Sequence, residues 1–322
     1  MNPPVPVTTT RRLRPISRRA AIGGAASGLL ALSGGAAWAV DRFLIEHVEV
    51  RSAGSAYQSS SAQPSASSSV ATRITATTYS GPSGQASYTK VEQGTGSEKV
   101  TYFVADVNLS TGTALRSAFA KDTFGDNVIE VPSVMAERSG AVLAINGDYY
   151  GFRSSGIEIR NGAVFRDQPE RQGLAIYRDG SFSLYDETST SATRLLADGV
   201  WQTLSFGPGL VDGGQVIDGI DEIEVDTNIG NHSIQGNQPR TAIGMIEPRH
   251  LIAVIVDGRS DGYSRGVDMI ELADIMQQAG CRVAYNLDGG GSSTLFFNGN
   301  VVNWPQGNGT ERGTSDILYI GK

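Results

Sequence analysis

The chain has 322 residues, of which 39% are hydrophobic and 18% are charged, and it contains 40 glycines. Residues 1–42 hold six of the 26 basic residues and one of the 33 acidic residues, so residues 43–322 carry a net charge of −12. Nucleic acid repels such an acidic body, and we therefore predict no nucleic-acid partner.

Cysteine and histidine are scarce. Cys281 is the only cysteine, which excludes a disulfide within the chain. His47, His232 and His250 lack the number and spacing of zinc ligands, which excludes a zinc site. Cys281 begins a predicted buried strand and no histidine is placed to activate it, which argues against a cysteine nucleophile.

The amino-terminal segment is predicted to direct export. Residues 11–19 read RRLRPISRR, and residues 20–40 contain no charge. Twenty-one residues of helix span the ~30 Å core of a bilayer, and the preceding arginines place the carboxyl-terminal body outside. Two interpretations remain open: a retained signal anchor, or an export signal of the twin-arginine type cleaved after Ala37-Trp38-Ala39. The first predicts a membrane-bound protein and the second a secreted one.

The predicted organisation has four parts. Residues 1–19 form a cytoplasmic basic segment and residues 20–40 the anchor or export signal. Residues 41–72 form a serine-rich stalk, because nine serines between 51 and 72 leave too little apolar surface to offset ordering entropy. Residues 73–322 form one domain, since no repeat or second linker interrupts them.

Short β-type runs separated by turns dominate this domain. The predicted elements follow in chain order: a strand at 102–107, a helix at 132–138, a strand at 141–145, hairpin turns at Asn161-Gly162 and Asp179-Gly180, a strand at 251–256, a helix at 268–279, strands at 281–287 and 295–297, and a hairpin turn at Asn298-Gly299.

The helix at 268–279 lies between two predicted strands, which predicts that these strands are parallel neighbours. The other strands are predicted to be antiparallel. The fold class is therefore α+β: a single domain with a large mixed, mostly antiparallel sheet and few helices.

Three polar clusters follow predicted strands, where open sheets build ligand sites. The first is Asn146-Gly147-Asp148-Tyr149-Tyr150, whose tyrosine rings suit a sugar. The second is Asp257-Gly258-Arg259. Each is also explained by a simple turn, the second with a solvated ion pair. We predict that both line a ligand site.

The third cluster runs from Asn286 through Asp288 and three consecutive glycines to Thr294. A glycine triplet carries a heavy entropy cost, and consecutive glycine amides can form a concave nest for an anion such as phosphate. A plain loop is the alternative. Arginine grips phosphate oxygens with its planar fork, and Arg240 and Arg312 are the candidates, although either could be a surface residue.

These motifs resemble those of the phosphodiester glycosidase family. The similarity covers residues 100–322 and is most specific in the NLDGGGSS block at 286–293. The pattern is closest to a bacterial surface branch that has been linked to exopolysaccharide biosynthesis. One departure concerns Gly147-Asp148, since the eukaryotic branch has two glycines there, and this argues against an essential role for Asp148.

The resemblance implies cleavage of a sugar-1-phosphodiester, such as an N-acetylglucosamine-1-phosphodiester, on a cell-surface glycan. Asp288 is the predicted catalytic carboxylate, with Asp257 as its partner. The predicted substrate-binding residues are Asn146, Gly147, Asp148, Tyr149, Arg240, Thr241, Gly258, Arg259, Gly289, Gly290, Gly291, Ser292, Ser293 and Arg312.

An alternative function remains open. A non-catalytic envelope module that binds phosphodiester-containing polysaccharide would use the same tyrosines and arginines without needing both carboxylates.

We predict no obligatory cofactor, but Asp148, Asp257 and Asp288 together could supply oxygen ligands to Ca²⁺ or Mg²⁺.

Overall fold

The structure is a computed structural model that describes residues 45–50, 71–225 and 233–322. Glu46–Lys322 form one compact unit. The predicted anchor at 20–40 lies outside the described residues, and in the described ranges no helix has the length and apolar character needed to cross a bilayer. Within the predicted stalk, His47–Val50 form strand β1, which pairs with β7 (Phe124–Asp126) and was not predicted.

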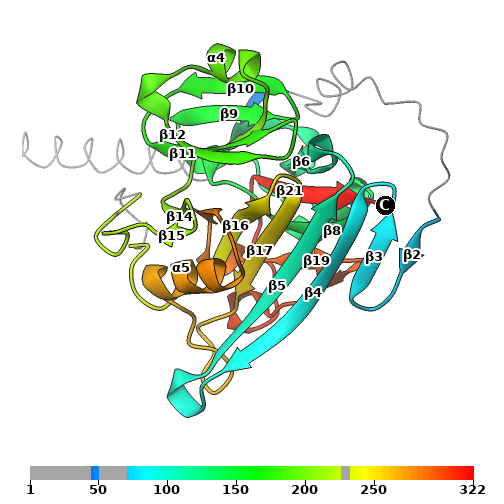
Figure 1. The fold of residues 1–322 in the computed structure, drawn as a ribbon, viewed down its shortest axis with the longest axis vertical. Helices are drawn as coiled ribbons and strands as arrows, with labels where there is room; N and C mark the ends of the chain where they lie inside the picture. Colours follow the sequence, from blue (N-terminus) through cyan, green and yellow to red (C-terminus); the bar gives the residue numbers. More distant parts are fainter. Residues whose placement is uncertain (1–44, 51–70, 226–232) are drawn as a thin grey trace, which may run out of the picture. The chain divides into compact units, whose positions relative to one another are not determined.

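The largest sheet has nine strands (Figure 1). Their order across the sheet is β15 (Gln215–Val216), β14 (Gly209–Asp212), β18 (Val283–Leu287), β16 (Arg240–Glu247), β17 (His250–Val256), β5 (Val100–Leu109), β4 (Gly84–Gln93), β3 (Thr78–Gly81) and β2 (Arg73–Ile74).

A second sheet has five strands, in the order β20 (Asn300–Val301), β19 (Leu295–Phe297), β8 (Ala141–Asn146), β21 (Asp316–Gly321) and β6 (Arg116–Phe119). Smaller sheets join β12 (Phe182–Asp186), β11 (Gln172–Tyr177) and β13 (Val200–Leu204), and β9 (Gly156–Arg160) with β10 (Ala163–Gln168). The α-helices of the described residues are α3 (Pro132–Arg138), α4 (Ala192–Ala197) and α5 (Met269–Gln278). This confirms the predicted α+β class with mostly antiparallel strands and few helices.

The prediction of two parallel neighbours around α5 is wrong. β16 lies between β17 and β18 and pairs antiparallel with both, with Thr241 opposite Ile255 on one side and Leu287 on the other. β17 and β18 run in the same direction because each opposes β16. A local crossover pattern cannot show that a third strand enters between the two, and all strand pairings in the described part of the chain are antiparallel.

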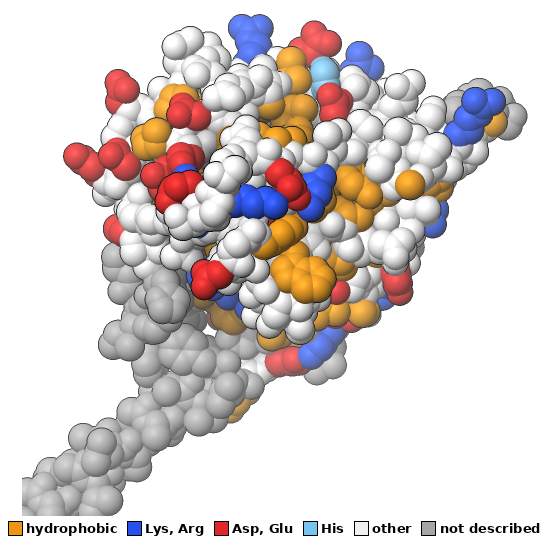
Figure 2. All heavy atoms as spheres, turned by 90° about the horizontal axis from the view of Figure 1, so that it is seen from below, with side chains coloured by type: hydrophobic (Ala, Val, Ile, Leu, Met, Phe, Trp, Pro, Cys, Tyr) orange, Lys and Arg blue, Asp and Glu red, His pale blue; other side chains and the backbone are white. Residues whose placement is uncertain are grey.

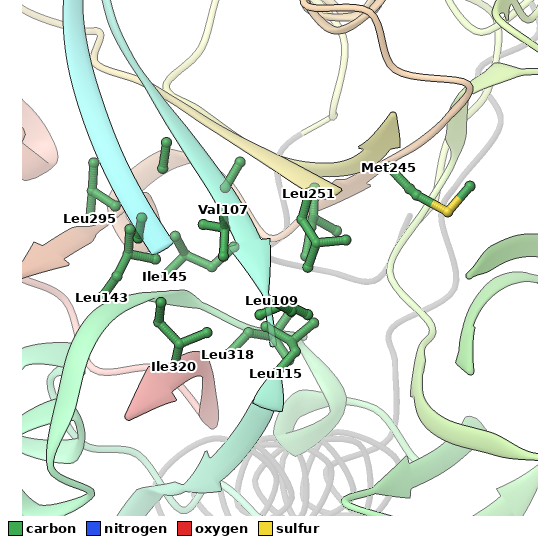
Figure 3. Packing of buried hydrophobic residues seen from close by; sticks show 14 of the residues in the cluster. Val107, Leu109, Leu115, Leu143, Ile145, Met245, Leu251, Leu295, Leu318 and Ile320 are labelled. Atoms are coloured by element: carbon green, nitrogen blue, oxygen red, sulfur yellow. The ribbon is translucent and has the colours of Figure 1, made fainter. Parts of the chain in front are cut away.

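The main core fills the space between the two large sheets (Figure 3). Alternate residues of each strand face it, as the two-residue period of a strand requires. Leu251 of β17 and Val107 of β5 come from the nine-stranded sheet, and they meet Leu143 and Ile145 of β8 and Leu318 of β21 from the five-stranded sheet. The predicted buried strands owe their apolar character to this packing.

Helices cover the outer faces of both sheets. Met269, Leu272 and Met276 of α5 pack against outward-facing residues such as Val254 of the nine-stranded sheet. Met135 of α3 packs in the same way against the five-stranded sheet. The resulting order of layers is helix, sheet, sheet, helix. The central strands of the nine-stranded sheet, such as β16 and β17, are therefore buried on both faces, whereas β4 has exposed residues along its length.

Two of the predicted Asn-Gly turns have the backbone conformation that such a turn requires. Asn161 and Gly162 have φ angles of 51° and 76°, and Asn298 and Gly299 have φ angles of 43° and 90°. They connect β9 to β10 and β19 to β20. At the third predicted turn, Gly180 alone has a positive φ, 89°, between β11 and β12.

Candidate active site

The topology brings the three predicted polar clusters to one region. β17 and β18 end at the same edge of the nine-stranded sheet, where β16 begins. Asp257 and Asp288 therefore follow their strands beside Arg240, which is opposite Val256 in the register. Because β16 lies antiparallel between β17 and β18, the polar residues that follow β17 and β18 lie beside the first residue of β16.

Asn146 connects the two large sheets at this edge. It ends β8 of the five-stranded sheet and is buried. Its Nδ2 donates to the carbonyl oxygen of Asp288 at 2.7 Å. Its Oδ1 accepts from Thr241 Oγ1 at 2.8 Å and from the Thr294 amide at 3.2 Å. Asn146 and Thr241 therefore position the glycine loop.

The backbone conformation and packing of residues 288–294, the glycine loop, account for two of its glycines. Gly290 has a φ of +59°, which favours glycine. A Cβ on Gly289 would lie 2.8 Å from the carbonyl oxygen of Pro239. The predicted nest of three free amides is wrong for Gly290, because its N–H donates to that same Pro239 oxygen at 2.8 Å. Close packing against the start of β16 therefore accounts for part of the triplet.

A cavity of about 170 Å³ opens beside this loop. Four arginines and one carboxylate are among its described lining residues, which are Tyr149, Arg153, Phe206, Val225, Ser233, Ile234, Gln238, Arg240, Arg259, Asp288, Gly289, Gly290 and Arg312. Figure 2 shows one face of the molecule, on which acidic and basic side chains are interspersed with hydrophobic ones. The cavity is therefore a local concentration of positive charge, suited to an anion.

Asp288 is the single carboxylate among the described lining residues of this cavity. Its side chain is 13% exposed. Oδ2 accepts from the Ser292 hydroxyl and lies 3.2 Å from Arg312 Nη2. Burial raises the pKa of Asp288, while Arg312 and the Ser292 hydrogen bond act in the opposite direction. No described residue bonds to Oδ1, so this oxygen remains available to a substrate or to water.

Arg240 forms a wall of the cavity and is buried. Its Nε donates to the Val267 carbonyl at 3.1 Å, and its Nη2 donates to the carbonyls of Ile234 at 2.5 Å and Gly236 at 2.7 Å. Burial lowers the pKa of Arg240 to about 10, so the guanidinium is still positively charged at neutral pH. Three carbonyl bonds fix its position, and Nη1 has no partner among the described residues.

Arg259 and Arg153 extend the positive lining. Arg259 donates from Nε and Nη2 to Gln238 Oε1 at 2.9 and 2.6 Å. Arg153 donates to the Ser205 carbonyl at 2.9 Å, and its guanidinium lies 4.9 Å from the centre of the Phe206 ring and 5.3 Å from that of Tyr149. An aromatic wall that includes Tyr149 therefore adjoins the charged surface, as we expected of a site for a sugar phosphate.

Asp257 is not among the described residues that line the cavity. Its buried carboxylate accepts from Asn303 Nδ2 at 2.9 Å, from the Trp304 amide at 3.0 Å and from Tyr263 Oη at 2.9 Å. Asn303 in turn donates to the Ser293 carbonyl at 3.0 Å. Asp257 therefore clamps the loop after β20 against the glycine loop, and the geometry gives no support to its predicted role as catalytic partner.

Asp148 is also committed to internal contacts. Its carboxylate accepts from the amides of Tyr149 and Ser205, and it lies 3.7 Å from the buried guanidinium of Arg160. The described residues contain no group of three His, Cys, Asp or Glu that could hold a metal ion. The three aspartates that we considered as Ca²⁺ or Mg²⁺ ligands therefore do not share a site.

The other predicted residues pack around the site. A Cβ on Gly147 would lie 2.2 Å from Asp316 Oδ1, and one on Gly258 would lie 2.9 Å from the Pro239 nitrogen. Gly291 packs against Arg312 and Ser293 is buried. These residues shape the region, but they are not among the described lining residues of the cavity.

Sequence reasoning missed part of the lining. Arg153 and Phe206 contact the cavity, as do Val225, Ser233, Ile234 and Gln238 in the segment before β16. Arg153 follows the Tyr149-Tyr150 motif closely enough for that motif to have indicated it. The segment between β15 and β16 has no strand or helix pattern, and no feature of it predicted contact with the site.

The chain belongs to the phosphodiester glycosidase family, whose sequence pattern matches residues 139–321. It is similar to the SPbeta prophage-derived uncharacterized protein YomE of Bacillus subtilis (strain 168), with 28% identity over 244 residues, which are 69% of this chain and 36% of the relative. An N-acetylglucosamine-1-phosphodiester alpha-N-acetylglucosaminidase of Bos taurus is 32% identical over 80 residues, which are 25% of this chain and 15% of the relative.

The chain thus matches little more than a third of the length of the first of these relatives, and less of the second. Among solved structures, the catalytic domain of zebrafish N-acetylglucosamine-1-phosphodiester alpha-N-acetylglucosaminidase, auto-inhibited by its pro-peptide, superimposes with a TM-score of 0.61 at 21% identity. That comparison covers 87% of this chain and 97% of the other. It shows a common fold.

Proposed function

We propose that this protein hydrolyses a sugar-1-phosphodiester, of the N-acetylglucosamine-1-phosphodiester type, releasing the sugar and leaving a phosphomonoester. Family membership supports this reaction class. The observation that carries the proposal is the cavity whose described lining residues include one carboxylate, Asp288, and four arginines. Such a cavity matches a substrate with one anionic phosphate next to a carbon that becomes positively charged.

The reaction breaks the bond between the anomeric carbon and a phosphate oxygen, and both electrons of this bond stay with the oxygen. The leaving group is already an anion of low basicity, so it needs little general-acid assistance, in contrast to ordinary glycoside hydrolysis. Water then bonds to the anomeric carbon. In our proposal Asp288 stabilises the developing positive charge and accepts the proton of this water through Oδ1.

The arginines hold the phosphate in this scheme. Arg240 is fixed by three backbone carbonyls and Arg312 by Asp288 and Ser292, so neither needs to reorganise when the substrate binds. Preorganised donors of this kind stabilise charge in a transition state better than mobile ones. The pairing of Arg312 with Asp288 also favours the ionised carboxylate, because it opposes the rise in pKa that burial causes.

Isotope labelling tests which bond breaks. The protein is incubated with a methyl diester of N-acetylglucosamine-1-phosphate in water enriched in oxygen-18, and the products are analysed by mass spectrometry. We expect the label in the sugar and none in methyl phosphate. Label in the phosphate would show P–O cleavage and contradict the glycosidase proposal. Binding of the diester without any release of sugar would instead support the non-catalytic envelope module.

We further propose that the domain acts outside the cytoplasm, attached to the membrane through residues 20–40. The support is the arginine-rich segment at 11–19 followed by 21 uncharged residues. Fractionation of cells with an antibody against the domain tests this. Full-length protein in the membrane fraction, degraded by protease added outside, is expected; a shortened soluble form would indicate cleavage after Ala39, and a cytoplasmic form would refute export.

A further inference from the structure

Two lining residues of the cavity, Tyr149 and Arg153, belong to one short stretch of chain after β8. The backbone of this stretch is held by Arg166 of β10. Nη1 of Arg166 donates to the carbonyl oxygen of Tyr150 at 2.9 Å and to that of Arg153 at 2.6 Å. Because both bonds end on the backbone of the stretch, they fix its course and with it the positions from which the two lining side chains extend.

Arg166 is itself held by the amino-terminal strand β1 and by its partner β7. Its Nη2 lies 3.1 Å from Asp126 Oδ1 of β7 and 3.4 Å from Glu49 Oε1 of β1. Its guanidinium lies 5.2 Å from the centre of the Phe124 ring in β7. The Arg166 side chain is only 6% exposed, and a buried charge of this kind needs its ionic partners. The position of Arg166 therefore depends on β1 and β7.

Apolar packing also joins β1 to the same stretch. Val50 of β1 packs against a cluster formed by Phe119, Phe124 and Tyr150. The rings of Phe124 and Tyr150 are stacked, with their centres 4.8 Å apart. Since Tyr150 lies in the stretch that carries Arg153, β1 contacts this stretch in two ways, through the aromatic cluster and through Arg166.

We infer that β1 is a positioning element of the active site, which acts through Arg166 on Arg153. The inference rests on the proposed function, in which arginines of the cavity hold the phosphate. It deepens that function, because the part of the chain needed for full phosphate affinity then begins with β1, ahead of the serine-rich stretch, and not at residue 73. Arg166 and Glu49 are positioning residues in this scheme and do not touch the substrate.

A substitution in β1 tests the inference by product binding, which requires no turnover. Val50→Asp places a charge against the aromatic cluster and should release β1, which hydrogen exchange of the β1 amides detects. The dissociation constant of methyl phosphate is measured by calorimetry on the full-length protein. We expect it to rise about three- to fivefold, since a displaced Arg153 loses part of a charged hydrogen bond. Val134→Asp, at a 45% exposed position of α3, is the matched control and should stay within twofold.

Arg153→Gln separates positioning from a general loss of structure. Alone it should weaken methyl phosphate binding roughly tenfold, as the loss of a charged hydrogen bond would. If β1 acts through Arg153, Val50→Asp should change the affinity of the Arg153→Gln protein by less than twofold, because effects that pass through one group do not add. Arg166→Lys retains the charge but lacks the planar fork, so it should weaken binding as Val50→Asp does.

Two results would overturn the inference. One is wild-type affinity in Arg166→Lys, or in Val50→Asp when β1 is released. The other is an equal loss of affinity with and without Arg153, which would show a general structural effect. A wild-type protein that does not bind methyl phosphate would refute the proposed function and this inference together, whereas normal wild-type binding with unaffected variants would remove the inference alone.

Discussion

Asp257 and Asp288 have similar positions in the sequence and opposite situations in the structure. Each follows a buried strand of the nine-stranded sheet and precedes glycine. Asp257 accepts hydrogen bonds from Asn303, Trp304 and Tyr263 on both carboxylate oxygens. Asp288 is bonded through Oδ2, and its other oxygen has no partner among the described residues.

An aspartate at a strand end thus acquires its role from the loops that pack on it. The Asn303-Trp304 segment saturates Asp257 and makes it a structural clamp. No such segment covers Asp288, which lines the cavity instead. The surrounding arginines compensate the negative charge of its carboxylate without covering it. Substitutions at the two positions should therefore separate activity from stability.

The largest expected effect comes from Asp288→Asn. The amide keeps one oxygen for Ser292 and Arg312 but cannot accept a proton from water. We expect kcat/KM for the diester to fall by about 10²–10⁴-fold, the usual contribution of a general base. Thermal unfolding should change little, because the variant also removes a buried charge. Exposed Asp212→Asn is the control. Wild-type turnover in Asp288→Asn would refute the assignment.

The next effect concerns Arg312→Gln. Loss of a charged hydrogen-bond donor to phosphate should lower kcat/KM by roughly 10–100-fold. Arg312 lowers the pKa of Asp288, so its removal should raise that pKa further. The active form is the carboxylate, and activity is lost as the pH falls through this pKa. The acidic limb of the kcat/KM profile should therefore move to higher pH in the variant, and an unmoved limb would contradict the coupling.

Asp257→Ala should show the reverse behaviour of Asp288→Asn. Its removal leaves the buried Trp304 amide without its acceptor and takes one of the two acceptors of Asn303 Nδ2, which should lower the free energy of unfolding by about 1–3 kcal/mol. Denaturant titration measures this loss. If Asp257 is a clamp, kcat/KM of the folded variant should fall by less than the 10²-fold that marks a catalytic base. A loss as large as that of Asp288→Asn would restore Asp257 as a catalytic residue.

The smallest expected effect belongs to Gly290→Ala. The positive φ of Gly290 should make alanine cost about 1–2 kcal/mol of unfolding free energy. A Cβ there would also lie 3.3 Å from Arg259 Nη2 at the cavity. Gly299→Ala is a matched control, since its φ is +90° and nothing lies within 4 Å of the added carbon. A KM increase in Gly290→Ala alone would place the loop in the binding surface.

Much of the fold follows from local patterns. The strands at 102–107, 141–145, 251–256 and 295–297 and the helices at 132–138 and 268–279 occur where periodicity predicted them, within a few residues. The predicted strand at 281–287 begins at Val283. What could not be predicted is the division into two packed sheets and the insertion of β16 between β17 and β18, because both depend on pairing between distant segments.

The candidate site likewise has features that local sequence predicts and features that depend on long-range packing. Local sequence is enough to identify the family motifs, the strand ends on which Asn146, Arg240 and Asp288 lie, and the family to which the chain belongs. Contacts between distant segments saturate the Asp257 carboxylate, pair the Gly290 amide with the Pro239 carbonyl, and bring Arg153 and Phe206 to the cavity. The physical reason is that local composition sets which groups are polar, whereas long-range packing sets which of their hydrogen-bonding positions remain open.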